Sequence, residues 1–235
     1  MAEDIFIACT QNAQDLKKQR KRLLLLSNRA IREMNDADLN SLTKLYALLY
    51  SAYAEVSLLK LIHTPTAFSD SEISQIQNGR NIEEKWERCV EFAFAKLNLT
   101  SNAGEIANKK QTLTRILDEY IIRPSQIRNK IAHGQWVICL NNAGTNINNS
   151  ATTEIKQLDF VKIDRLFSIY EKFLQCILDL AVSQKTHYRD YYYIITELNK
   201  YVDSTKSWSI ETKKQKILIS LKYQRYKGRK DGLEQ

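Results

Sequence analysis

The chain contains few of the residues that interrupt helices, with six glycines and two prolines among 235 residues. Glycine and proline are the strongest local breakers of regular structure, so their scarcity argues against a fold of short strands joined by tight turns. Apolar residues recur at helical spacing along most of the chain, and 43% of all residues are hydrophobic. We therefore expect an all-α fold in which long helices bury a sizeable core.

Cysteine is also scarce, and its spacing excludes two classes of small scaffold. The four cysteines lie far apart, with no Cys-x-x-Cys pair: Cys9, Cys89, Cys139 and Cys176. A disulfide framework or a zinc knuckle would need cysteines in closely spaced sets. We expect reduced thiols in a cytoplasmic protein, and neither a metal nor a cofactor.

The sequence offers no segment that we would expect to enter a membrane. The N-terminus begins acidic, with Glu3 and Asp4, and has no basic segment ahead of a long apolar stretch. A secretory signal needs that order of segments. We also expect no apolar run long enough to span a bilayer, and so no membrane partner.

Acidic residues are outnumbered, with 27 Asp and Glu against 35 Lys and Arg and a formal net charge of +8. Such a balance favours a polyanionic partner, and RNA is the one we expect. One cluster of cations near the N-terminus is a candidate RNA-binding surface: Lys17, Lys18, Arg20, Lys21 and Arg22. A solvated helix face would explain the same cluster equally well.

The spacing of apolar residues and breakers predicts helices over about 12–35, 36–62, 69–77, 81–97 and 105–122. A further helix should start at Pro124-Ser125 and end near Gly134. Beyond it, residues 136–140 and 152–155 flank an Asn- and Gly-containing stretch at 141–150, which predicts a small β-hairpin. The helical pattern returns at Asp159 and continues through two more helices.

No internal repeat and no linker rich in Pro, Gly or Ser divides the chain. We therefore expect one domain over residues 1–235. Its core should cover about residues 38–180, with the N-terminal helix and a C-terminal helical extension packed on that core.

The densest polar chemistry in the chain lies in the run Ile127-Arg128-Asn129-Lys130-Ile131-Ala132-His133-Gly134. On a helix, Asn129 and His133 are four residues apart and share a face, whereas Arg128 lies roughly 140° from His133. Gly134 predicts the helix end, which places the imidazole at the negative end of the helix dipole and favours its protonated form. Because one chain focuses these groups imperfectly, two such helices across a dimer axis would build a composite site.

These residue types suit the cleavage of an RNA phosphodiester without metal. Attack by the 2′-hydroxyl needs a base for its proton, a cation for the phosphate oxygens and an acid for the departing 5′-oxygen. A histidine such as His133 can act as the base and the acid, because imidazole gains and loses protons near neutral pH. Arg128 can supply the cation, because a guanidinium binds phosphate through two parallel donors. Asn129 would orient the histidine or a phosphate oxygen, and Lys130 would add a cation for RNA.

The spacing Arg128-Asn129-x-x-x-His133, late in an all-helical chain, resembles the signature of the HEPN superfamily (higher eukaryotes and prokaryotes nucleotide-binding). Glu55 on the second helix stands where members often carry a polar residue. The resemblance covers about residues 38–180 and implies a homodimer of helical bundles with a metal-independent endoribonuclease site at the interface. It makes Arg128, Asn129 and His133 the catalytic set, in a toxin or antiviral-defence effector.

One departure from that family pattern concerns regulation. A related toxin branch carries tyrosine two residues beyond the histidine, where a partner nucleotidyltransferase modifies it, but this chain has Gln135. An antitoxin of that kind is therefore not expected, although another antitoxin or regulatory protein remains a possible partner. Two alternatives stay open: a catalytically inactive module that binds RNA or a nucleotide, and an interaction protein whose apolar helix faces contact another chain.

Overall fold

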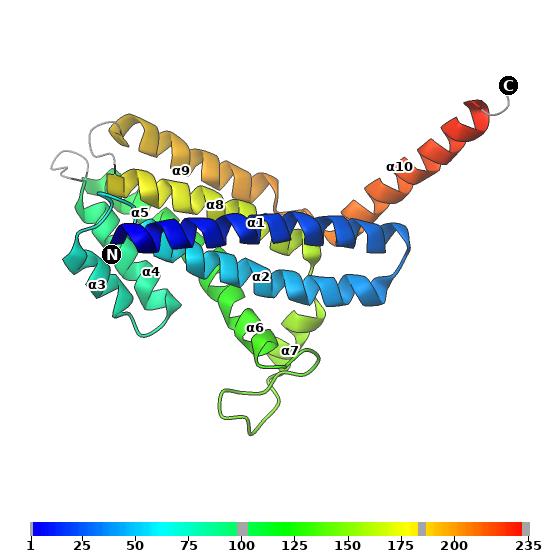
Figure 1. Ribbon diagram of the computed structural model, residues 1–235, viewed down its shortest axis with the longest axis horizontal. Helices are drawn as coiled ribbons and strands as arrows, with labels where there is room; N and C mark the ends of the chain where they lie inside the picture. The colour runs from blue at the N-terminus through cyan, green and yellow to red at the C-terminus, as the bar shows by residue number, and fades with distance from the viewer. Residues whose placement is uncertain (1, 98–102, 183–186, 232–235) are drawn as a thin grey trace.

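The computed structural model describes residues 2–97, 103–182 and 187–231. Within these ranges every regular element is helical, which confirms the all-α prediction (Figure 1). The elements are α1 (Ala2–Arg32), α2 (Asp36–Ile62), α3 (Asp70–Gln77), α4 (Ile82–Ala95), α5 (Ala103–Leu117), the π-helical turn η1 (Asp118–Ile122), α6 (Arg123–Ala132), α7 (Asn149–Lys156), α8 (Phe160–Val182), α9 (His187–Ser204) and α10 (Ile210–Asp231).

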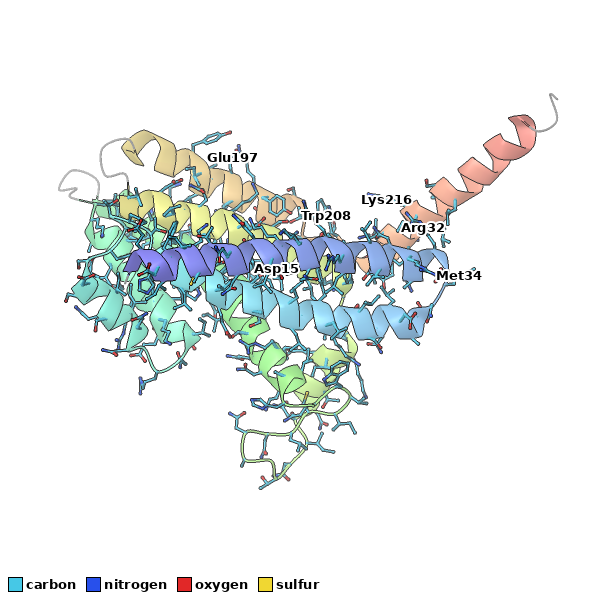
Figure 2. The ribbon with its side chains drawn as sticks, in the orientation of Figure 1. Asp15, Arg32, Met34, Glu197, Trp208 and Lys216 are labelled. Atoms are coloured by element: carbon cyan, nitrogen blue, oxygen red, sulfur yellow. The ribbon has the colours of Figure 1, made fainter. Side chains whose placement is uncertain are left out.

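The two N-terminal helices form a long antiparallel pair (Figure 1). α1 begins at Ala2 rather than near residue 12, because Glu3 and Asp4 in its first turn favour a helix N-terminus. Figure 2 shows Met34 at the turn that joins the pair, where its backbone has a positive φ of 55°. Asn35 then caps α2 by accepting a hydrogen bond from the backbone N–H of Asp38 at 3.0 Å.

α2 and α8 pack together at the centre of the bundle through aromatic side chains. The rings of Tyr46 and Phe160 stack at 4.4 Å between centroids, and Phe167 meets the Tyr46 ring at 5.1 Å. Trp86 of α4 extends the stack and meets Phe173 at 5.3 Å. Each of these side chains is almost fully buried, and such burial is worth about 2–3 kcal/mol for a large apolar side chain.

The central helix α2 corrects one expectation from the sequence. By length and composition alone it could cross a membrane, although we expected no such segment. In this bundle, 56% of the most apolar part of α2 is buried inside the protein. The core position of α2 explains its composition, because a helix packed on several sides carries apolar residues on several faces.

α6 begins at Arg123 with Pro124 in its first turn, which confirms the predicted helix start to within a residue, but α6 continues directly from α5 and η1 without a break. Proline has no backbone N–H, so the carbonyl four residues earlier, on Tyr120, loses its helical partner. The Tyr50 hydroxyl donates to that carbonyl at 2.8 Å. The π-helical turn over Asp118–Ile122 provides the altered hydrogen-bond spacing that accommodates the proline ring.

The predicted β-hairpin after the motif helix is wrong. Among the described residues there is a single isolated antiparallel bridge, between Leu140 and Ile147, and no strand. Residues 152–155, the expected second strand, lie in α7. Asn148 determines this outcome, because its side chain accepts from the Ala151 N–H at 3.0 Å and so caps a helix where we expected a strand.

Candidate functional site

The motif helix α6 ends in a C-terminal cap that fixes the position of His133. Gly134 has a φ of +79°, a conformation that glycine adopts without strain. Its N–H donates to the Ile131 carbonyl at 3.0 Å, and the N–H of Gln135 donates to the Lys130 carbonyl at 2.9 Å. This pair of bonds is the Schellman arrangement, so the sequence correctly predicted the helix end.

His133 and Asn129 face an open cleft between α6, the following loop and α7. Both side chains are exposed, and neither has a hydrogen-bond or ion-pair partner among the described residues. The cleft has a volume of about 810 Å³ and is lined mainly by polar side chains. These include Gln126, Asn129, Lys130, His133, Asn142 and Glu154. The imidazole and the carboxamide are therefore both available to a ligand.

Two residues of the motif region hold the cleft loop in place. The ammonium group of Lys130 donates to the Leu140 carbonyl at 2.7 Å and to Asn142 Oδ1 at 3.2 Å. The side chain of Gln135 accepts a hydrogen bond from the Leu140 N–H at 2.8 Å. Lys130 thus shapes the cleft wall in addition to contributing a positive charge, and Gln135 holds the backbone of the same loop.

Arg128 lies on a different face of α6 and does not line this cleft. Its guanidinium donates to the carboxylate of Glu55 on α2, and the ion pair joins the two helices. The Nε of Arg128 is buried and finds no hydrogen-bond acceptor among the residues that the structure describes. Partial burial lowers the pKa of Arg128 from its usual value, yet a guanidinium remains charged at any working pH.

The structure therefore brings three of the four candidate residues on α6 together and separates the fourth. Asn129, Lys130 and His133 line one cleft, whereas Arg128 pairs with Glu55. This divergence agrees with the helical spacing in the sequence. A single chain does not place the guanidinium beside the imidazole.

The cations of α1 lie away from the cleft, because α2 packs against both α1 and α6. Lys18, Lys21 and Arg22 are exposed. Lys17 pairs with Glu171 of α8 at 3.0 Å.

Arg20 differs from its neighbours in the cluster because it faces the bundle. Its Nη2 lies 2.8 Å from Asp164 Oδ1, and the Tyr46 hydroxyl donates to the same oxygen at 2.6 Å. The guanidinium also lies 4.6 Å from the centre of the Phe167 ring. The structure thus gives Arg20 a role in docking α1 onto α8.

Sequence reasoning missed an apolar pocket of about 470 Å³ beside the cleft. Ile127 and Glu154 line both the cleft and the pocket. Tyr50, Tyr120 and Leu166 line the apolar side, while Arg123 and Lys162 are among the charged lining residues. The sequence signal for this pocket was the helix cap at Asn148. Recognising it would have predicted α7, the helix that carries the lining residue Glu154.

The remaining titratable candidates lie apart from the cleft. No three side chains of His, Cys, Asp or Glu converge on a possible metal position within the ranges 2–97, 103–182 and 187–231. All four cysteines are free thiols and are buried. His63 caps the C-terminus of α2 and is buried, with its Nε2 3.2 Å from Gln77 Nε2.

Comparison of the whole chain with protein-family models, with curated proteins and with solved structures finds no match.

Proposed function

We propose that this protein is a metal-independent endoribonuclease that acts as a homodimer. One observation carries the proposal: the exposed side chains of His133 and Asn129 share a cleft and have no partner within the described part of the chain. Arg128 lies on the adjacent face of the same helix, and its Nε has no partner there either. Exposed side chains without protein partners are hydrated, and a substrate can replace that water. These three residues also form the Arg-Asn-x-x-x-His pattern that resembles the HEPN superfamily.

In this proposal the three side chains divide the chemistry of one displacement at phosphorus. The 2′-hydroxyl of RNA attacks the adjacent phosphate, His133 exchanges protons with the reacting oxygens, and the bond to the 5′-oxygen breaks. Asn129 orients the phosphate or the imidazole. Arg128 exchanges Glu55 for the phosphate and stabilises the negative charge that develops in the transition state.

A second copy of the chain completes the site in this account. Arg128 and His133 occupy different faces of α6, so two-fold symmetry would let one copy present its guanidinium to the imidazole of the other. The resemblance to HEPN domains supports the same HEPN-like bundle and dimer. A toxin or antiviral role, and any antitoxin or regulatory partner, rest on the resemblance alone.

The two adjoining cavities provide room for a nucleotide and its neighbouring phosphate. The polar cleft holds Lys130 and the imidazole of His133, and the apolar pocket beyond Ile127 offers a surface for a base. Apolar walls with a few polar groups at the rim are typical of small-ligand sites. We expect the nucleotide that supplies the 2′-hydroxyl to place its base there.

The test is incubation of purified wild type with total cellular RNA in the presence of EDTA, followed by mapping of the new ends. The proposal predicts 2′,3′-cyclic phosphate and 5′-hydroxyl ends, and their loss in His133→Ala and in Arg128→Ala. The matched control is Lys216→Ala, which removes an exposed cation of α10 outside the cleft and should leave cleavage unchanged. Cleavage that requires magnesium, or that survives loss of both His133 and Arg128, would refute the mechanism.

A second candidate function is binding of RNA or a nucleotide without cleavage. The specific observation in its favour is the ion pair between Arg128 and Glu55, which keeps the guanidinium away from His133 within one chain. Retention of RNA without new ends, reduced by the same two substitutions, would select this candidate.

A further inference from the structure

A separate pocket of about 320 Å³ lies where α2, the segment after α6, α7 and the start of α10 meet. It opens on a different face of α7 from the cleft, because Lys156 lines this pocket and Glu154 lines the cleft. Apolar walls come from Leu39, Trp136 and Phe160. The pocket shares no lining residue with the cleft that contains His133.

Lys44 of α2 is the unusual residue in this pocket. Its side chain is among the buried ones, with 8% exposure, yet no carboxylate pairs with it among the described residues. Its Nζ lies 5.6 Å from the centre of the Trp136 ring, which is the single interaction found for the ammonium group in the described part of the chain. Among the described residues, the Lys44 nitrogen is not one of the fully enclosed unpaired atoms, so the stem of the side chain is covered while its ammonium group reaches the open pocket.

The neighbouring charges make the pocket more positive rather than neutralising Lys44. Lys156 and Lys214 also line it, and the carboxylate of Asp36 is paired with Lys214 at 2.6 Å. The carboxylate of Asp159, next to the pocket residue Phe160, bonds to backbone N–H groups and not to Lys44. One of its oxygens accepts from the N–H of Val161 at 2.7 Å, and the other accepts from the N–H of Ile210 at 2.9 Å.

We propose that this pocket binds the phosphate group of a small ligand, either free phosphate or a mononucleotide, with Lys44 as the buried anchor. Lys156 lines the same pocket and adds a positive charge, whereas Lys214 is paired with Asp36. Charge-assisted hydrogen bonds from lysine to phosphate are strong in such a partly dehydrated site. The volume is at the lower end of the range for small-ligand pockets, and the apolar walls suit a sugar or base. This inference does not depend on the proposed ribonuclease activity.

If the proposal is right, Lys44 contributes to ligand binding and not to the stability of the unliganded protein. Lys44→Met preserves the approximate length of the mostly covered side chain and removes a charge that has no acidic partner among the described residues. The unliganded variant should therefore melt at the wild-type temperature or above it, as happens when a functional group in a strained environment is replaced. If Lys44 were purely structural, loss of its contact with Trp136 would lower the melting temperature.

The experiment measures binding of two probes, inorganic phosphate and adenosine 5′-monophosphate, to the full chain by calorimetry and thermal shift. We expect Lys44→Met to weaken binding by about tenfold to a hundredfold. The matched control is Lys60→Met, because Lys60 is also on α2 and lies 5.5 Å from the Phe6 ring but outside this pocket. Lys60→Met should leave binding unchanged.

A second variant keeps the test informative if Lys44→Met does not fold. Lys156→Met removes an exposed cation of the same pocket and should also weaken binding. Tighter binding of the mononucleotide than of phosphate would show that the apolar walls hold the nucleoside, and equal binding would assign the site to phosphate alone. Absence of binding for both probes, or equal affinities in wild type and both pocket variants, would overturn the proposal.

Discussion

The guanidinium of Arg128 on α6 donates to the carboxylate of Glu55 on α2, so the permanent cation of the motif is held on a different face from the imidazole of His133. The ion pair is partly exposed, with 23% of the Arg128 side chain and 51% of the Glu55 side chain accessible. Exposed pairs of this kind are weak. A phosphate could therefore displace Glu55 at little cost.

Replacing Glu55 by glutamine should strengthen RNA binding. The variant keeps a hydrogen-bond acceptor for Arg128 but removes the negative charge that competes with the substrate phosphate. We expect KM for RNA to fall roughly twofold to fivefold, with kcat not reduced. The control is Glu33→Gln, which alters an exposed Arg–Glu pair on α1, away from the cleft. A rise in KM would mean that the charge of Glu55 positions Arg128 rather than restraining it.

Arg20 and Lys21 should behave differently although they are neighbours in one basic cluster. Arg20→Met breaks the partly buried contact with Asp164 and should lower the free energy of unfolding by about 2 kcal/mol, somewhat less than for a fully buried pair. Urea unfolding measures this change. Lys21→Met removes an exposed cation and should leave stability unchanged. If Arg20→Met instead reduced the salt dependence of RNA binding at constant stability, the structural role of Arg20 would be contradicted.

The sequence predicted the helical elements with clear periodicity and caps. α3 has the Ser69 cap and α4 the Asn81 cap at the expected positions, and Gly134 ends the motif helix as expected. Local signals sufficed there because the cap and the apolar face lie within a few residues of each other.

Tertiary context determined the features that the sequence analysis missed. Pro124 correctly indicated the start of α6 but not its continuity with η1, where the Tyr50 hydroxyl, distant in sequence, donates to the Tyr120 carbonyl. The separation of Asn129 and His133 from Arg128 followed from helical spacing. The sequence did not predict that Arg128 pairs with Glu55, because this contact depends on how α2 packs against α6.

Gly134→Ala should destabilise the end of α6. No atom lies within 4 Å of the position that a Cβ would occupy, so the cost comes from the positive φ alone and should be about 1 kcal/mol. We expect a larger loss of cleavage activity than of stability, because the cap sets the position of His133. Gly134→Asn, which tolerates this conformation better, is the control. Full activity in Gly134→Ala would show that the cap does not position the imidazole.

His63 should make stability fall at mildly acidic pH. Burial lowers its pKa below the ordinary value, so the folded protein favours the neutral ring. The unfolded chain then takes up more protons as the pH drops below about 6.5, and the stability present above that pH is progressively lost. Urea unfolding at pH 7.5 and 5.5 measures this loss, which should shrink in His63→Leu and persist in His133→Ala. An equal loss in His63→Leu would assign the pH dependence to other groups.

Mixing two inactive variants tests most directly whether the motif is half of a site that a second copy completes. Arg128→Ala lacks the cation and His133→Ala lacks the imidazole, but a mixed dimer retains one site with Arg128 from one copy and His133 from the other. Random exchange should restore about a quarter of wild-type RNA cleavage. Cleavage no greater than that of either variant alone would contradict the composite site.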